Sequence, residues 1–234
     1  MSCQESIGAK VKVTLTGPDG KVLKVIEDEN PDPFDRQFLM LTFEGFFGQV
    51  GAISIQDIFY NTLWVYVSPT STFLGFGALS MPPCLIGCGG LPNSPPNGPG
   101  LLFFSDDLSS SYSCRVSVVN CSSPVTSGIA YSPLKVSPSF VEDAFGPNPG
   151  MASFTVSQSA TNVSGSPITV TVVSLIAAVA GTANPSPALI PVSLFALSPP
   201  LVWSPGVTIT VSVTYIFPYG IPVSSSSPGS ITAV

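Results

Sequence analysis

The chain has 234 residues, which is long enough for one large β domain or two small ones with a full hydrophobic core. Only 9% of the residues are charged, against roughly 25% in a soluble globular domain, and the net charge is −6 without any histidine. These features exclude the basic stripe that binds nucleic acid, catalysis by Ser-His-Asp or Cys-His arrangements, and histidine-ligated metal sites. The 21 glycines and 25 prolines stand largely between β-type runs, which is typical of a sandwich or barrel.

Charge is also distributed unevenly along the chain. Asp143 is the last acidic or basic residue, so residues 144–234 carry no charged side chain. Because low charge removes the repulsion that keeps proteins apart, we predict that this region supplies the main subunit contact and that salt does not weaken that contact. The alternative is a neutral, Ser/Thr-rich exposed face suited to acidic or saline surroundings.

The hydropathy of the chain predicts neither a targeting signal nor a membrane-spanning segment. Residues 1–12 lack the apolar core of a secretory signal peptide, so we expect synthesis in the cytosol. The most apolar stretch, 170–180, is interrupted by Thr171 and Ser174 and is shorter than the roughly 20 residues of a spanning helix. It is predicted to be a core strand, and no membrane span is expected.

The first predicted elements are a β-hairpin and a helix. Residues 10–16 and 21–26 flank a Gly-Pro-Asp-Gly turn at 17–20, and the first of them alternates apolar and polar side chains. After an acidic run at 27–35, residues 36–48 are apolar on nearly every side. Acidic residues suit the start of a helix, so this pattern predicts a helix buried on more than one side.

From residue 52 onward the sequence predicts strands and turns. The clearest strand is 207–216, where Val, Ile and Tyr alternate with Thr and Ser in the period of two that only a strand gives. The Pro/Gly-rich segment 82–100 is predicted to be a long loop. The other predicted strands are 53–58, 63–68, 101–104, 113–119, 153–157, 168–176 and 188–194.

Together these elements predict an all-β fold, an antiparallel β-sandwich of jelly-roll or Ig-like type with one N-terminal hairpin and a short apolar helix. Three parts are expected along the chain. Residues 1–50 form the hairpin and helix packed on the sandwich, residues 51–216 form the sandwich, and residues 217–234 form an extended Ser/Pro-rich tail. The tail is the segment that we expect to reach a neighbouring subunit.

Carboxylates are the remaining candidates for acid–base or metal chemistry. They are Asp106 with Asp107, Glu142 with Asp143, and the cluster Glu27, Asp28, Glu29, Asp32 and Asp35. Adjacent residues on a strand point to opposite faces, so turn or cap roles fit these pairs better than catalysis. Calcium binding by the cluster is the alternative, because hard oxygen ligands suit that ion, although the spacing matches no calcium loop. We predict no enzymatic activity and no catalytic, cofactor-binding or metal-binding residue.

The five cysteines leave two interpretations open. Disulfides would join Cys84 with Cys88 and Cys114 with Cys121, leaving Cys3 free, and would require oxidation after release or a hyperthermophilic host. Buried thiols packed as small apolar side chains are the alternative. Zinc fits less well, because Cys-x3-Cys with Cys-x6-Cys is not a usual ligand spacing.

Two further patterns concern carbohydrate. Asn120 and Asn162 begin sequences that match the glycosylation acceptor pattern, which is short and matches often by chance. Trp64, Tyr66 and Trp203 could stack on sugar rings of a host-surface glycan, but aromatic residues at alternating strand positions more often belong to a core or a cross-strand pair.

The order of four segments along the chain is similar to that in a known family of proteins. The segments are 9–26, 35–48, 162–176 and 204–217. This order resembles a family of small virion proteins encoded among the tail and fibre genes of phages and archaeal viruses, in which a hairpin and an apolar helix precede a β-sandwich. Members of that family usually carry Glu-Gly-Leu where this chain has Val173-Ser174-Leu175. The resemblance implies a virion part without catalytic residues.

The first functional hypothesis is therefore a virion structural protein, such as a capsid, turret, spike or tail component, made in the host cytoplasm by a virus of a thermophile. Its expected partners are copies of itself and other structural proteins of the same assembly, with no nucleic acid. The alternative is a subunit of an extracellular surface filament assembled by strand donation. A carbohydrate-binding β module is the third hypothesis.

Overall fold

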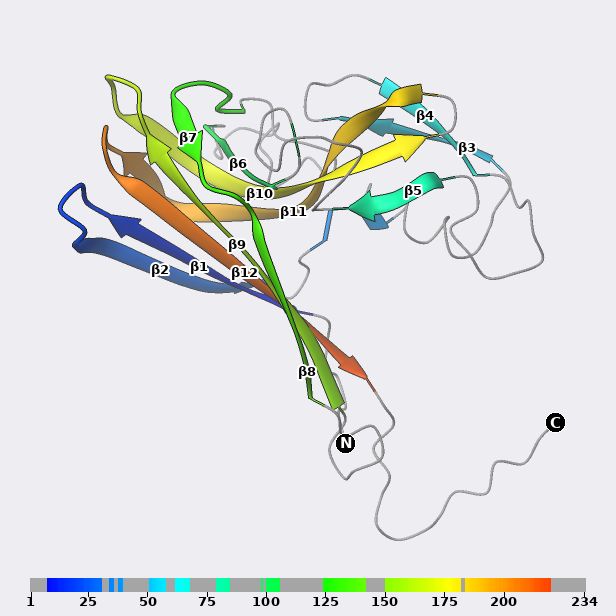
Figure 1. Cartoon of the computed structure of the whole chain (residues 1–234), viewed down its shortest axis with the longest axis horizontal. Coiled ribbons are helices and arrows are strands. Elements are labelled where there is room, and N and C mark those ends of the chain that lie inside the picture. The colour runs from blue at the N-terminus through cyan, green and yellow to red at the C-terminus, as the bar shows by residue number, and fades with distance from the viewer. Residues whose placement is uncertain are drawn as a thin grey trace, which may run out of the picture.

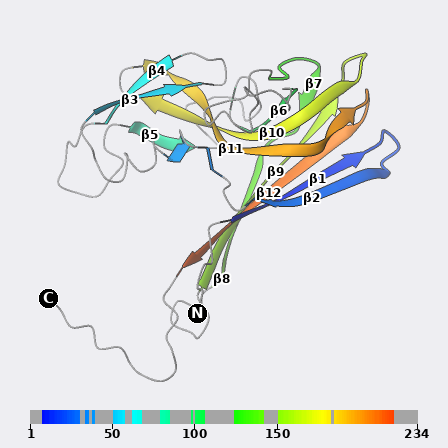
Figure 2. The same ribbon diagram turned by 180° about the vertical axis from the view of Figure 1, so that it is seen from behind.

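The computed structural model describes residues 8–30, 34–35, 38–39, 51–57, 62–67, 79–84, 98, 100–105, 124–141, 150–181 and 184–219. These residues are almost entirely β-strand and form two antiparallel sheets and a separate hairpin (Figures 1 and 2). The all-β part of the predicted fold is therefore confirmed. The hairpin consists of β3 (Gly51–Gln56) and β4 (Thr62–Val67).

The larger sheet has six strands and begins with the predicted N-terminal hairpin. Its order is β2-β1-β12-β9-β7, and β8 also pairs with β9. Because β1 pairs along its length with β12, the hairpin belongs to this sheet. Its strands are β1 (Gly8–Thr16), β2 (Val22–Asn30), β7 (Ile129–Tyr131), β8 (Lys135–Val141), β9 (Gly150–Asn162) and β12 (Thr208–Tyr219).

The second sheet has four strands. Strand β10 is central and pairs with β11 on one side and with both β5 and β6 on the other. The strands are β5 (Leu79–Cys84), β6 (Gly100–Phe104), β10 (Ile168–Gly181) and β11 (Asn184–Trp203).

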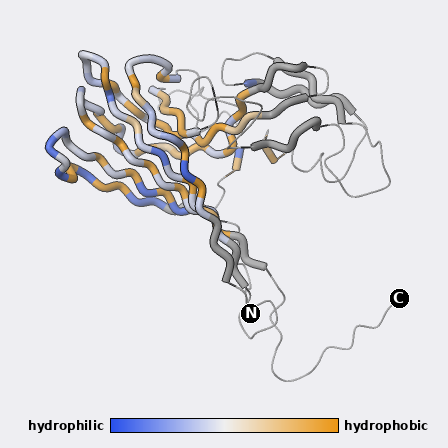
Figure 3. The backbone as a smooth tube through the Cα atoms, in the orientation of Figure 1, coloured by the Kyte–Doolittle hydropathy of each residue, from blue (hydrophilic) through white to orange (hydrophobic). Residues whose placement is uncertain are grey.

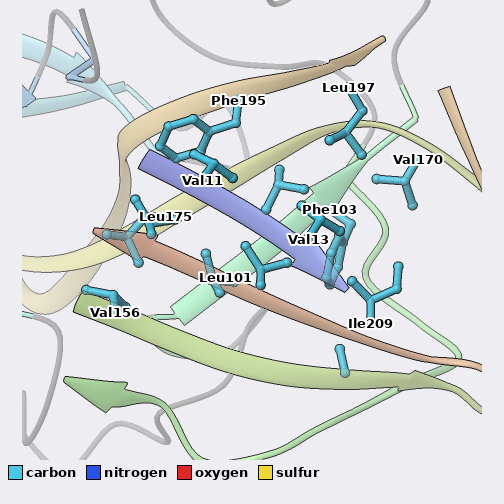
Figure 4. Close-up of a cluster of buried hydrophobic side chains, with 14 of the residues drawn as sticks. Val11, Val13, Leu101, Phe103, Val156, Val170, Leu175, Phe195, Leu197 and Ile209 are labelled. Atoms are coloured by element: carbon cyan, nitrogen blue, oxygen red, sulfur yellow. The ribbon is translucent and has the colours of Figure 1, made fainter. Parts of the chain in front are cut away.

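One hydrophobic core joins the two sheets. On β12 and directly before it, the residues Val207, Ile209, Val211, Val213 and Tyr215 are buried, as the alternation in the sequence predicted. They belong to the same cluster as buried side chains of the four-stranded sheet, several of which Figure 4 shows together. Those residues include Leu101, Phe103, Val170, Leu175, Phe195 and Leu197.

Strand β10 is buried on both of its faces. Val173 and Leu175 belong to the core between the sheets, whereas Val172 and Ile176 belong to a second cluster with Leu102. A strand covered on both sides contains apolar residues without alternation, which is why this stretch is so apolar in the sequence. Much of the uncharged region after residue 144 is therefore core, and only part of it can be a contact surface.

The acidic residues at 27–29 were assigned to the approach to the predicted helix, but the structure places them on a strand. Glu27 and Asp28 lie on β2, which continues to Asn30 and pairs with β1 throughout. An edge strand leaves its side chains accessible to water, so it accommodates consecutive charged residues. Of the predicted helix at 36–48, the structure describes only residues 38 and 39, and the amide of Leu39 donates to the carbonyl of Asp35 at 3.0 Å.

Several strands extend further than predicted, and three were missed. Strands β9, β10 and β11 are longer than 153–157, 168–176 and 188–194, and β5, β7 and β8 had no predicted counterpart. The predicted loop at 82–100 starts within β5 and ends in β6. The predicted strand at 113–119 lies outside the described residues.

Proline positions in the strands follow the sheet edges. Strand β11, which contains several prolines, is an edge strand of its sheet. Strand β12 continues to Tyr219, into the segment predicted as tail, and Pro218 pairs with Met151 of β9. The described pairing of β12 with β1 ends at Ile216, so Pro218 does not leave a gap in a central ladder. Residues 220–234 of the predicted tail lie outside the described residues.

Candidate assembly surface on the six-stranded sheet

The outward side of the six-stranded sheet is rich in hydroxyl groups. Over residues 155–161 of β9 and 208–214 of β12, half-buried serines and threonines alternate with buried residues, so the two strands present matched columns of hydroxyls. We call these eight residues the hydroxyl face. They are Thr155, Ser157, Ser159 and Thr161 on β9 and Thr208, Thr210, Ser212 and Thr214 on β12.

Three cross-strand pairs connect the two columns of the hydroxyl face. In each pair the two side-chain oxygens lie 2.8 Å apart, so one hydroxyl donates to the other. The pairs are Thr155 with Thr214, Ser159 with Thr210, and Thr161 with Thr208. Such pairs hold the side chains in fixed positions, so a partner surface that covers them need not order them.

Charged residues border the hydroxyl face on the side of β1 and β2. The ammonium group of Lys12 lies 2.6 Å from a carboxylate oxygen of Glu27, and both side chains are exposed. The hydrogen bond from Lys12 and its positive charge lower the pKa of Glu27 below its usual value. An open groove of about 610 Å³ lies here, lined by Lys10, Val11, Lys12, Glu27, Asp28, Ser212 and Thr214.

Beyond this groove, β2 forms an exposed edge of the sheet. Its described pairing is with β1 on one side only, and Figures 1 and 3 show the hairpin at the margin of the molecule. Val22, Leu23 and Val25 are 61%, 59% and 46% exposed. The unpaired backbone groups of an open edge strand are a template for pairing with another chain, and exposed apolar side chains favour the burial that pairing brings.

Those of the predicted acidic residues that the structure describes do not come together as a site. Glu27 is paired with Lys12, and Asp35 is buried, with its amide donating to the carbonyl of Val192 at 2.7 Å. Asp106, Asp107, Glu142 and Asp143 lie outside the described residues, as does Asp32. Among the residues that are described, no group of three or more potential metal ligands is found.

Most cysteines are also outside the described part of the chain. Cys84 ends β5, whereas the structure describes none of Cys3, Cys88, Cys114 and Cys121. Both proposed disulfides therefore stay predictions.

Trp203 is a core residue and is not available to stack on a sugar. Its side chain is completely buried, its indole nitrogen donates to the carbonyl of Val207 at 2.7 Å, and its ring centroid lies 5.0 Å from that of Phe103. The favoured interpretation of this residue as part of a core is confirmed, and the alternative of sugar stacking by Trp203 is excluded. Trp64 and Tyr66 lie on β4, and their side chains are not described.

Asn162 is equally buried, and its amide is fully used. Its nitrogen donates to the carbonyls of Trp203 and Ser166 at 2.8 and 3.0 Å. Its oxygen accepts from the amide and hydroxyl of Ser164 at 2.9 and 2.7 Å. A glycan would have to be attached to that same nitrogen, so a glycosylated Asn162 is incompatible with this fold. Asn120 lies outside the described residues.

Polar side chains also connect the two sheets through the core. The side-chain oxygen of Gln158 on β9 accepts from the amide of Leu101 on β6 at 2.7 Å. The hydroxyl groups of Tyr215 on β12 and Ser193 on β11 are hydrogen-bonded to each other. These contacts fix the position of the six-stranded sheet relative to the other sheet, because a buried polar group that loses its partner is costly.

Two tyrosines whose hydroxyl groups are buried give a matched test of this argument. Burial raises the pKa of both Tyr131 and Tyr215. Among the described residues the hydroxyl of Tyr131 has no hydrogen-bond partner, whereas that of Tyr215 is bonded to Ser193. We expect Tyr131→Phe to raise the free energy of unfolding by about 1 kcal/mol and Tyr215→Phe to lower it by about 1 kcal/mol or more. Denaturant titration measures both, and equal effects of the two changes would contradict the assignment.

The sequence revealed only part of this surface. The hydroxyl column of β12 follows directly from the alternation at 207–216. The column on β9 was missed beyond residue 157, because the inward residues there include Gln158, Ala160 and Asn162, which do not stand out as a core stripe. The exposed edge of β2 could have been inferred only from the sheet order.

Comparison with known proteins adds no further constraint: no protein family, curated protein or solved structure matches this chain. Within the described ranges, no helix is long and apolar enough to cross a membrane.

Proposed function

We propose that this chain is a non-catalytic structural protein that assembles with copies of itself, as a component of a virion. The observation that carries the proposal is the hydroxyl face, a neutral surface on which six of the eight side chains are already held in cross-strand pairs. A second copy that covers the hydroxyl face buries no charge there, and the side chains of the face lose little conformational freedom. The two sheets would form a β-sandwich of jelly-roll or Ig-like type that presents this face outward.

Two alternatives follow from the same architecture. A surface filament assembled by strand donation would use the exposed edge of β2, because an added strand satisfies the backbone groups of an open edge. In a carbohydrate-binding module, the buried Trp203 could not bind sugar, so binding would depend on Trp64 and Tyr66. The virion protein is preferred because the resemblance in the order of segments points to it.

A charged side chain at the centre of the hydroxyl face tests the proposal. We expect Thr210→Lys to reduce assembly at least about tenfold in concentration, because the lysine would be buried without a partner at the contact. The matched control is Ser204→Lys, which places the same charge at an exposed position outside the face. Light scattering over a concentration series measures both variants, and circular dichroism establishes that both are folded.

The hydroxyl face would not be the contact if Thr210→Lys assembled like the unaltered protein. Equal loss of assembly in both variants would show that added positive charge in general, and not its position, opposes association.

A further inference from the structure

The charged residues of the protein are concentrated on the N-terminal hairpin. Four of the seven basic residues lie within residues 10–24, at Lys10, Lys12, Lys21 and Lys24. On β2 the two signs are separated: Lys24 lies near its beginning, and Glu27, Asp28 and Glu29 lie towards its end, whereas Lys21, directly before the strand, is paired with Asp19 of the turn. The edge strand therefore runs from a positive end to a negative end.

The same strand has a regular section that can accept another strand. From Lys24 to Asn30 its register with β1 is continuous, and the one register shift lies nearer the turn, at Leu15 and Thr16. Bulges and lysines protect an edge from indiscriminate pairing. Here the irregularity affects only the turn end, and seven consecutive residues remain regular.

We propose that β2 pairs antiparallel with β2 of a second copy, so that two six-stranded sheets become one continuous sheet across a two-fold axis. This inference rests on the proposed self-assembly and names one contact within it. Antiparallel pairing places the positive end of each strand beside the negative end of the other, whereas parallel pairing would place like charges together. The charge order of β2 thus favours one orientation and a partner of the same sequence.

The pairing also has a preferred register. A two-fold axis normal to the sheet keeps each side chain on its own face, so the two facing residues must both be even-numbered or both be odd-numbered. With Ile26 on the axis, Lys24 of each copy faces Asp28 of the other. Val25 then faces the aliphatic part of Glu27, whose carboxylate is held by Lys12 of its own chain.

Charge reversal tests this pairing directly. We expect Lys24→Glu and Asp28→Lys each to weaken self-association about tenfold or more, because each variant places two like-charged pairs across the axis. An equimolar mixture of the two variants should associate again. In the mixed dimer the introduced glutamate of one copy would face the introduced lysine of the other, and the unaltered Lys24 and Asp28 would face each other.

Two further variants complete the comparison. The double variant K24E/D28K should associate by itself, because it restores opposite charges at both facing positions. Lys135→Glu, an exposed charge reversal on β8 at the other side of the sheet, is the control and should leave association unchanged.

Sedimentation velocity at about 0.1 M salt, where charged groups within about 10 Å still interact, measures all of these samples. Association of the single variants at the strength of the unaltered chain would overturn the β2 pairing, as would a mixture that remains monomeric. A further outcome is that the unaltered chain and the charge variants all associate, and that deletion of residues 220–234 alone abolishes association. In that case the tail makes the contact and β2 self-pairing is wrong. If the unaltered chain does not associate at all, the proposed function fails as well.

Discussion

Trp203→Ala is expected to cost about 4 kcal/mol of the free energy of unfolding, a large part of the roughly 5–15 kcal/mol of a typical domain. The side chain is completely buried, contacts Phe103 of the same sheet and donates its indole hydrogen to the carbonyl of Val207, directly before β12 of the other sheet. Alanine would leave a large cavity between the two sheets and an unpaired carbonyl. Both effects lower the free energy of unfolding. Neither water nor a neighbouring side chain can replace the indole without rearrangement of the core.

The adjacent residue provides the control. Val202 is 62% exposed, so Val202→Ala should change the free energy of unfolding by no more than about 0.5 kcal/mol. Urea titration followed by circular dichroism compares the two variants. A small effect of Trp203→Ala would mean that the tryptophan does not join the sheets as described.

Asn162→Ala is expected to cost about 3 kcal/mol, although it removes only a small side chain. The amide of Asn162 makes four hydrogen bonds, and two of its partners, the carbonyl of Trp203 and the amide of Ser164, would lose them in a buried or half-buried setting. Asn162 joins the end of β9 to the end of β11, so the loss acts on both sheets. The effect should therefore resemble that of a core cavity.

Val163→Ala is the control for Asn162→Ala, since Val163 is the next residue and is 63% exposed. Thermal unfolding of the two variants should show a clearly lower midpoint for Asn162→Ala only. Equal midpoints would contradict the structural role of the amide. Mass spectrometry of the natural protein should find Asn162 without a glycan.

The sequence predicted strands best where one face is apolar and the other polar. Strand β12 and strand β1 were identified because their apolar residues alternate with hydroxyl or charged residues. Strand β10 has no such alternation, since both of its faces are buried, and its end was predicted at residue 176 instead of Gly181. Strand β11 was shortened by its prolines, which an edge strand tolerates.

The candidate surfaces were predicted less well, because they depend on which strands are neighbours. Glu27 and Asp28 were assigned to the approach to a helix, since acidic residues suit the start of a helix, and the pairing with β1 shows an edge strand instead. Likewise, the hydroxyl face exists only because β9 and β12, far apart in the sequence, lie side by side. For Trp203 the sequence favoured a core role but left sugar stacking open, and its complete burial decides between the two.

The central claim is that the chain assembles with copies of itself, and sedimentation velocity of the unaltered protein tests it most directly. Over a concentration series from about 1 to 100 μM, a range that covers typical self-association constants, we expect a shift from the 24.2 kDa monomer to larger species. Electron microscopy of the largest species should show a closed or extended regular assembly. A single 24.2 kDa species at every concentration and salt would contradict the account.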